Sequence, residues 1–137
     1  MLVPDFHKIN GHALTAATDV IIPVQADKFS LDGVGQIYRT ITQARKYSNR
    51  ELKLRGILLT RHNARAVVSR YAEKQAELAA AEMGTFVYRT YIRECVALKE
   101  IQYRAQQNIY EYDEGGNAAA DYTAFVDEFI ERGKSHG

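Results

Sequence analysis

The chain has 137 residues, a formal net charge of +1 and a single cysteine, Cys95. The length suits one domain with a buried core, and the near-neutral charge means that any nucleic-acid binding depends on a local basic cluster. One cysteine cannot form an internal disulfide, which is typical of a reducing compartment. No apolar run approaches the ~20 residues of a membrane span, and the N-terminus lacks a signal-peptide pattern. We therefore expect one soluble, cytoplasmic domain spanning residues 1–137.

The first half of the chain predicts a strand followed by a helix. Residues 1–12 are expected to be irregular, because proline, asparagine and glycine interrupt any period. Residues 20–25 (VIIPVQ) form a continuous apolar run, the pattern of a buried parallel strand, although Pro23 is more typical of an edge strand. Ser30 is a good N-cap for a helix that reaches about Tyr47.

The second half predicts two further strands around an alanine-rich helix. Residues 52–60 (LKLRGILLT) have a strand pattern, and residues 66–83 strongly favour a helix, with Gly84 as its C-cap. Residues 85–92 (TFVYRTYI) are rich in β-branched and aromatic side chains, so we expect a third strand there. Residues 93–108 are ambiguous.

A final helix closes the chain. Residues 109–112 could add a short strand and residues 113–116 form a turn, after which Asn117 caps the helix. Gly133 is expected to end it, leaving residues 134–137 as a disordered tail. The predicted apolar face consists of Tyr122, Phe125, Val126, Phe129 and Ile130.

This alternation of strands and helices defines the fold class. Strands separated by helices of such length imply βαβ crossovers, which are right-handed and build a parallel sheet. We therefore predict an α/β fold in which a parallel sheet is flanked by helices.

Several stretches resemble one family in their order and spacing. Residues 13–25 (ALTAATDVIIPVQ), 31–33 (LDG) and 56–60 (GILLT) are similar to ParA-type partition ATPases, the deviant-P-loop relatives of MinD and Soj. Residues 93–100 (RECVALKE) and 109–122 resemble the family's closing segments. The resemblance covers the C-terminal half of that family, and it implies a partial P-loop NTPase fold, Rossmann-like with three layers.

The chain lacks the family's phosphate-binding loop. It has no G-x-x-x-x-G-K-[ST] loop, whose backbone N–H groups would surround the phosphates. Full-length members also place a magnesium-organising aspartate before the A-L-T-A-A segment, where residues 1–10 lie here. Phosphoryl transfer depends on positioning and charge compensation. We therefore expect no catalytic residues and no cofactor bound by this chain alone, although the family uses ATP and Mg²⁺.

Ligands of open α/β sheets bind beyond the carboxyl ends of the strands. The resemblance implies that the adenine side of a nucleotide lies near Thr60, Arg61, Arg93 and Glu94. The alternative is that these are ordinary polar loop residues. Asp27 matches a family glutamate near the dimer face, but an acid after a strand is more often a solvated or helix-entry residue.

An arginine cluster follows the second predicted strand. Arg65 matches a family position at which an arginine helps to hold nonspecific DNA, and Arg61 and Arg70 lie nearby. Arg61 and Arg65 are four residues apart and would share a helical face if the helix begins early. A second family arginine position is Ala97 here, so a solvated helix start is an equally good interpretation.

The remaining reactive side chains predict no site. The four histidines, His7, His12, His62 and His136, show no ligand spacing, so we expect no metal site. Cys95 has no partner histidine nearby and is expected to be an inert thiol.

Three functions remain open. The first is a truncated ParA-like plasmid or chromosome partition protein: a non-catalytic binding module whose partners are a second copy, nonspecific DNA or a ParB-like protein. The second is half of a partition ATPase whose P-loop lies on an absent segment or another chain. The third is an unrelated small α/β binding module. In the first case the strand at residues 20–25 would have an exposed edge, which favours a homodimer.

Overall fold

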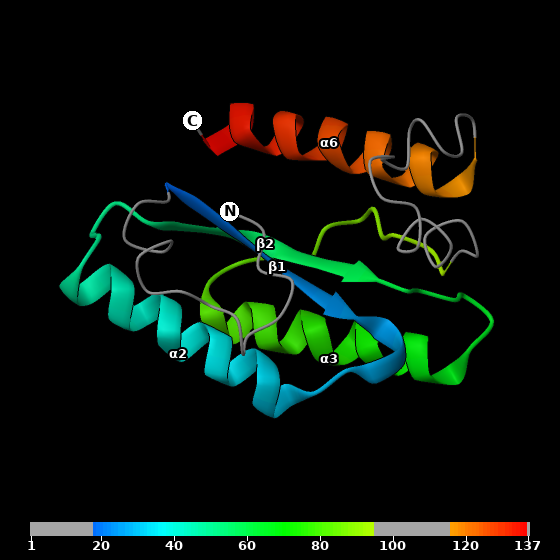
Figure 1. The fold of residues 1–137 in the computed structure, drawn as a ribbon, viewed down its shortest axis with the longest axis horizontal. Coiled ribbons are helices and arrows are strands. Elements are labelled where there is room, and N and C mark those ends of the chain that lie inside the picture. Colours follow the sequence, from blue (N-terminus) through cyan, green and yellow to red (C-terminus); the bar gives the residue numbers. More distant parts are fainter. Residues whose placement is uncertain (1–17, 95–115, 137) are drawn as a thin grey trace, which may run out of the picture.

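The computed structural model describes residues 18–94 and 116–136 (Figure 1). The elements in chain order are β1 (Asp19–Gln25), the short 3-10 turn η2 (Ala26–Lys28), α2 (Leu31–Tyr47), β2 (Lys53–Thr60), α3 (Val67–Met83) and α6 (Asn117–His136). Our predictions for residues 1–12, 95–108 and 109–115 lie outside the described residues.

The sheet is parallel, as predicted. Strand β1 pairs with β2 from Asp19↔Lys53 to Gln25↔Thr60. The register shifts between Val20 and Ile22, so β2 has one more residue than β1 at this point. Gly56 lies in the shifted stretch with a φ of 108°, a conformation that side chains with a Cβ rarely adopt.

The predicted third strand at residues 85–92 is only partly formed. This segment runs along β2 through isolated parallel bridges, Ile57↔Val87 and His62↔Arg93, and it has no continuous ladder. The prediction of a regular strand is therefore wrong. The reason is tertiary: the backbone N–H groups of Arg89 and Thr90 donate to the carboxylate of Glu128 on α6, at 2.9 and 2.8 Å.

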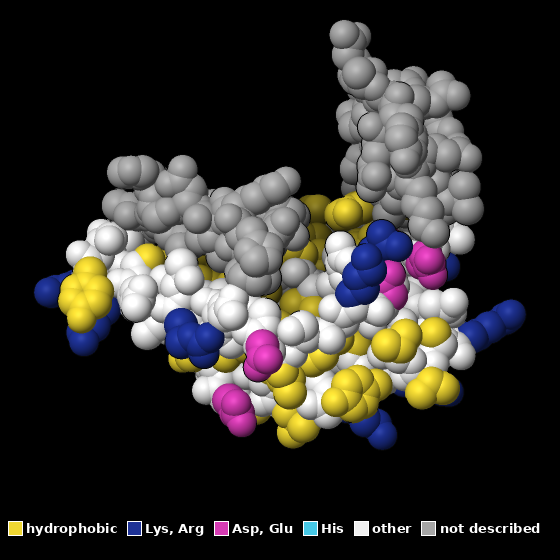
Figure 2. All heavy atoms as spheres, turned by 60° about the horizontal axis from the view of Figure 1, so that its bottom comes forward, with side chains coloured by type: hydrophobic (Ala, Val, Ile, Leu, Met, Phe, Trp, Pro, Cys, Tyr) yellow, Lys and Arg dark blue, Asp and Glu magenta, His cyan; other side chains and the backbone are white. Residues whose placement is uncertain are grey.

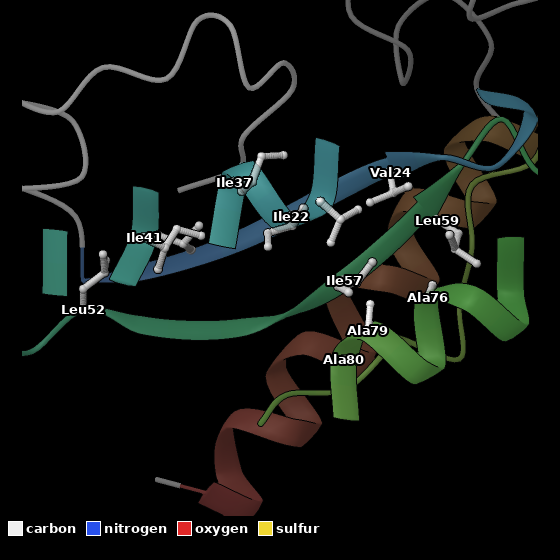
Figure 3. Packing of buried hydrophobic residues seen from close by; sticks show 12 residues of the cluster. Ile22, Val24, Ile37, Ile41, Leu52, Ile57, Leu59, Ala76, Ala79 and Ala80 are labelled. Atoms are coloured by element: carbon white, nitrogen blue, oxygen red, sulfur yellow. The ribbon is translucent and has the colours of Figure 1, made fainter. Parts of the chain in front are cut away.

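The described elements form three layers (Figure 1). Helices α2 and α3 cover one face of the sheet, and α6 lies on the other. Alternate residues of each strand point to opposite faces, so Ile57 and Leu59 pack toward α2 and α3 while Leu58 packs toward α6. Figure 3 shows the larger cluster, in which Ile22 and Ile57 lie between the strands and the helices. The α/β fold with a parallel sheet and flanking helices is confirmed.

Helices α2 and α3 match their predictions closely. The Ser30 hydroxyl accepts the backbone N–H of Gly33 at 3.1 Å and begins α2. Gly84 ends α3 with a left-handed φ of 72°, and its N–H closes the last turn by donating to the Ala81 carbonyl.

Helix α6 differs from its prediction in two respects. The predicted end at Gly133 is wrong, because α6 continues to His136 and leaves only Gly137 outside the described residues. Glycine weakens a helix interior by about 1 kcal/mol but does not break it. Val126 and Ile130 are exposed, whereas Tyr122, Phe125 and Phe129 pack on the sheet. None of the described helices has both the length and the apolar character needed to cross a membrane.

Candidate functional site

The ends of the parallel strands and of the segment beside them meet at one edge of the sheet. We call this region, comprising Asp27, Thr60, Arg61, Arg93 and Glu94, the carboxyl edge. The Thr60 hydroxyl donates to the Val24 carbonyl at 3.4 Å, which ties the ends of β1 and β2 together. The bridge His62↔Arg93 places the third segment beside the end of β2. The structure therefore brings together the residues for which the resemblance implied an adenine side.

Arg61 forms an ion pair across this edge. Its Nε lies 2.9 Å from Oδ2 of Asp27, and both side chains are partly exposed. Arg61 has a φ of 52°, so it turns the chain sharply after β2. Because α3 begins only at Val67, the early helix start that would have put Arg61 and Arg65 on one helical face does not occur. Asp27 lies in the first turn of η2, which agrees with the helix-entry interpretation, and it is paired with Arg61 rather than only solvated.

A buried histidine lies next to Arg61, and sequence reasoning missed its role. The His62 side chain is 1% exposed, and its Nε2 lies 2.6 Å from Oε1 of Glu73 on α3. The ring stacks on Tyr91, with centroids 3.8 Å apart. Nδ1 is buried without a hydrogen-bond partner among the described residues. Of the two tautomers of the ring, this geometry favours the one with hydrogen on Nε2, because a hydrogen on Nδ1 would be an unpaired buried donor.

Arg93 is held by Asp121 of α6. The Arg93 guanidinium donates through Nε at 3.0 Å and through Nη2 at 2.9 Å to the two carboxylate oxygens of Asp121. The backbone N–H of Arg93 donates to the same carboxylate at 2.9 Å. The Asp121 side chain is only 13% exposed, so this is a charge-assisted contact that water screens weakly.

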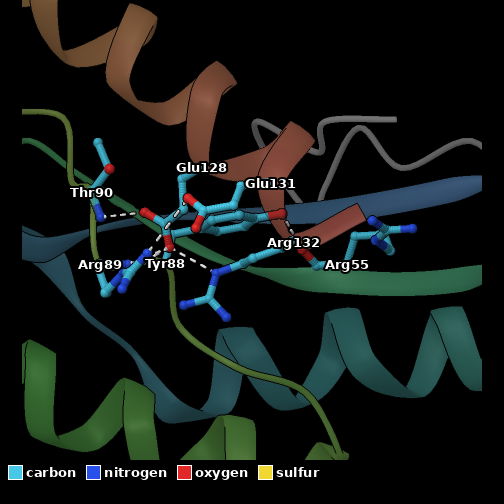
Figure 4. Close-up of polar contacts among 7 residues, drawn as sticks. All are labelled: Arg55, Tyr88, Arg89, Thr90, Glu128, Glu131 and Arg132. Atoms are coloured by element: carbon cyan, nitrogen blue, oxygen red, sulfur yellow. Dashed lines mark hydrogen bonds and ion pairs between the residues drawn. The ribbon is translucent and has the colours of Figure 1, made fainter. Parts of the chain in front are cut away.

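A second carboxylate of α6 holds the third segment farther along (Figure 4). Glu128 accepts the N–H groups of Arg89 and Thr90, and Arg132 Nε lies 2.8 Å from it. Burial alone would raise the pKa of Glu128. The hydrogen bonds from Arg89, Arg132 and Thr90 outweigh burial and lower that pKa to about 2. Glu128 is therefore ionised at neutral pH, although it is buried.

Tyr88 links the same cluster to β2. Its hydroxyl donates to the carbonyl of Arg55, beside the register shift. Burial raises the pKa of Tyr88 to about 12, against the lowering effect of Arg55 and Arg132. The guanidinium of Arg132 lies 4.2 Å from the centre of the Phe86 ring, a cation–π contact. These contacts anchor α6 to the sheet.

Asp121 and Glu128 carry a sequence signal that our predictions overlooked. They lie seven residues apart on α6, on the same side as the apolar residues that pack on the sheet. An acid within an apolar helical stripe has to be paired in the folded protein. The pattern would have flagged both residues, but it could not have named their partners.

Arg65 lies just before α3, and Arg70 lies in the first turn of that helix. Both residues are exposed. Exposed apolar residues of α3 lie beside them in the sequence, namely Val67, Val68 and Tyr71. Figure 2 shows hydrophobic side chains interspersed with Lys and Arg and with Asp and Glu on the face that carries α2 and α3. The charge of this face is therefore mixed.

Within the described part of the chain, no three His, Cys, Asp or Glu side chains gather to hold a metal ion. The side chains of His7, His12, His136 and Cys95 lie outside that part, so our expectations for them are untested.

Comparison with known families and proteins gives consistent matches. Residues 2–54 match a family model described as an AAA domain, AAA_31. The chromosome-partitioning ATPase Soj of Thermus thermophilus is 34% identical over 97 residues, covering 71% of this chain and 38% of Soj. The chromosome partitioning protein ParA of Caulobacter vibrioides is 33% identical and is covered to 35% of its length. The sporulation initiation inhibitor Soj of Bacillus subtilis is 28% identical over 130 residues and is covered to 50%.

Solved structures agree with these matches. Cobyrinic acid a,c-diamide synthase from Mycobacterium smegmatis superposes with a TM-score of 0.53 at 31% identity, covering 72% of this chain and 36% of the synthase. The same synthase with bound ADP and magnesium gives a TM-score of 0.54 at 26% identity, over 90% of this chain and 42% of the synthase.

The chain thus spans between about a third and half of the length of the proteins that it matches. The fold is that of P-loop ATPase-like proteins. By its matched family model and by its Soj and ParA relatives, this chain is similar to ParA/Soj-type P-loop ATPases.

Proposed function

We propose that this chain is a ParA-like partition protein of the cytoplasm that works by binding rather than by catalysis of its own. In this proposal the carboxyl edge receives the adenine side of a nucleotide, and the start of α3 contacts DNA without sequence preference. Further partners are a second copy of the chain and a ParB-like protein. Similarity to the Soj and ParA proteins supports this proposal over an unrelated α/β binding module.

The observation that carries the proposal is the pairing of the third segment with the end of β2. The Glu94 N–H donates to the His62 carbonyl at 2.9 Å, so Arg93 and Glu94 lie beside Thr60 and Arg61. Polar groups gathered at this edge occupy the place where open α/β sheets bind ligands.

The described residues fit a base better than they fit phosphates or Mg²⁺. Arg61 and Arg93 are each neutralised by an internal carboxylate, Asp27 and Asp121 respectively. Within residues 18–94 and 116–136, no acidic cluster is available for a metal. The family uses ATP and Mg²⁺. The described residues support binding of only the uncharged adenine end of that nucleotide.

Nucleotide binding is tested by fluorescence anisotropy with N-methylanthraniloyl-ADP. We expect saturable binding that unlabelled adenosine and ADP both displace and that inorganic phosphate does not. If phosphate displaced the probe as well as adenosine did, recognition would rest on charge, and the proposed adenine side would be wrong.

DNA binding is tested with labelled duplexes of two unrelated sequences. Contacts to the phosphate backbone give sequence-independent affinity that falls steeply with salt. We expect Arg65→Ala and Arg70→Ala to weaken binding to both duplexes equally. Lys46→Ala, on the exposed last turn of α2, is the matched control and should leave binding unchanged. Equal losses from all three variants would mean that the start of α3 is not the contact surface.

The second candidate is half of a partition ATPase whose P-loop lies on an absent segment or another chain. The superposition on a synthase that binds ADP and magnesium favours it, because the chain spans 42% of that protein. An in-frame K-G-G-x-G-K-T sequence upstream in the coding DNA would support this candidate.

A further inference from the structure

We infer that Asp121 is a positioning residue: it orients Arg93 so that the carboxyl edge can receive a nucleotide base. The inference rests on the nucleotide binding proposed above and assigns a role to α6, the helix on the opposite face from α2 and α3.

The contacts of Asp121 are directed at one residue. Both carboxylate oxygens accept from the Arg93 guanidinium, and Oδ2 also accepts the Arg93 backbone N–H. A carboxylate that binds backbone and side chain of the same residue fixes its φ and its rotamer together. The Arg93 side chain is 46% exposed and the Asp121 side chain is 13% exposed. Asp121 therefore lies below the surface and Arg93 faces solvent.

The placement of Arg93 propagates to its neighbours at the carboxyl edge. The Ile92 N–H donates to the Leu59 carbonyl, and the Glu94 N–H donates to the His62 carbonyl, both at 2.9 Å. The segment regains the ladder of β2 only here, after the interruption at Arg89 and Thr90. Asp121 holds Arg93 at the point where this segment pairs again with β2. Loss of Asp121 should therefore make Arg93 and Glu94, which would contact a base, more mobile.

Asp121 also determines which chemistry Arg93 can offer. The carboxylate bound to Nε and Nη2 of Arg93 compensates the positive charge of the guanidinium, so the electric field on its solvent side is weak. Its planar face suits stacking on a flat, uncharged base. A phosphate would have to compete with Asp121 for the same donors.

Glu128 provides a matched control on the same helix. It lies seven residues after Asp121, about 10 Å along the helix axis at 1.5 Å per residue. It also binds backbone N–H groups of the third segment, but at Arg89 and Thr90, away from the carboxyl edge. Loss of either carboxylate should weaken the docking of α6, whereas only loss of Asp121 should disturb Arg93.

The test combines binding and stability measurements on the 137-residue protein. N-methylanthraniloyl-ADP is titrated into the wild type, Asp121→Asn, Arg93→Ala, the double variant and Glu128→Gln, well below each unfolding midpoint. We expect Asp121→Asn and Arg93→Ala each to weaken binding about tenfold, the loss of one charge-assisted contact. The double variant should be no worse than Arg93→Ala, because Asp121 acts through Arg93. Glu128→Gln should lower the unfolding midpoint and leave affinity unchanged.

The outcomes separate this inference from the proposed function. If the wild type binds the probe and Asp121→Asn binds it equally well, the positioning role is wrong while the proposed function stands. Additive losses in the double variant, or an equal loss of affinity in Glu128→Gln, would show a purely structural role and overturn the inference. If the wild type does not bind the probe, the proposed nucleotide site is itself wrong, and the inference fails with it.

Discussion

The carboxylate of Glu128 accepts the backbone N–H of Arg89 at 2.9 Å, across 39 residues of sequence. The N–H of Thr90 donates to the same carboxylate. At these two residues, hydrogen bonds to a side chain of α6 take the place of hydrogen bonds to the neighbouring strand. One buried acid therefore interrupts the third strand and fastens the last helix.

We expect Glu128→Gln to destabilise the protein by about 1–3 kcal/mol, because the amide cannot accept from both N–H groups and from Arg132. The free energy of unfolding in urea measures this loss. Glu131→Gln is the control: this glutamate lies on the same helix, but its side chain is 73% exposed and its ion pair with Arg89 spans 3.9 Å. Its change should stay within about 0.5 kcal/mol. Equal effects of the two variants would contradict the role assigned to Glu128.

Acid should weaken the fold through the same residue. The folded pKa of Glu128 is about 2, below its ordinary value of 4.5, so the unfolded chain binds the proton more readily. The contribution of Glu128 to stability is therefore complete above about pH 4.5 and is lost as the pH falls toward 2. Urea midpoints measured across this window should fall more steeply for the wild type than for Glu128→Gln. Parallel curves would show that other carboxylates dominate acid unfolding.

Glycine at position 56 is required by the register shift of the sheet. A Cβ there would lie 2.8 Å from ring atoms of both Phe86 and Tyr88, and the φ of 108° disfavours any side chain. We expect Gly56→Ala to lower the free energy of unfolding by at least about 1–3 kcal/mol.

Gly35→Ala is the matched control within α2. The nearest atom to its added Cβ is Arg39 Nη1 at 3.5 Å, an ordinary contact. Alanine is the better helix former, so this variant should be more stable by about 0.5–1 kcal/mol. A Gly56→Ala protein as stable as the wild type would mean that the shifted register is not essential to the fold.

We expect the 137-residue chain to release no phosphate from ATP above the rate in buffer. Its sequence contains no Walker A loop to bind the phosphates, and Arg61 is already paired with Asp27. A steady-state phosphate-release assay with Mg²⁺ checks this. Turnover that disappears in Asp27→Ala or Arg61→Ala would contradict it, whereas turnover that survives both variants would indicate a contaminating ATPase.

We expect the chain to associate with itself through the exposed face of α3. Val67, Tyr71 and Leu78 lie on one side of that helix and are 72%, 55% and 62% exposed. Apolar side chains gathered on one surface favour association. Light scattering at increasing concentration should show dimers, and Leu78→Lys should reduce them. Ile130→Lys, which removes an exposed apolar residue from α6, is the control; a stable monomer at high concentration would refute the prediction.

Elements whose signals are local could be predicted from the amino-acid order. The Ser30 cap, the apolar spacing of α2 and the left-handed Gly84 are recorded within one or two helical turns of sequence. The pattern of residues 52–60, half alternating and half fully apolar, likewise predicted the strand β2. These features hold wherever the segment lies in the fold, so the α/β class was accessible without the structure.

The construction of the carboxyl edge, by contrast, depends on contacts between layers. Residues 85–92 favour a strand locally, but Glu128 offers two of their N–H groups a charge-assisted bond that the ladder cannot match. Arg93 and Asp121 are 28 residues apart, and Arg61 and Asp27 are 34 apart. No local pattern encodes such pairs, because the choice of partner depends on which layers meet when the core closes.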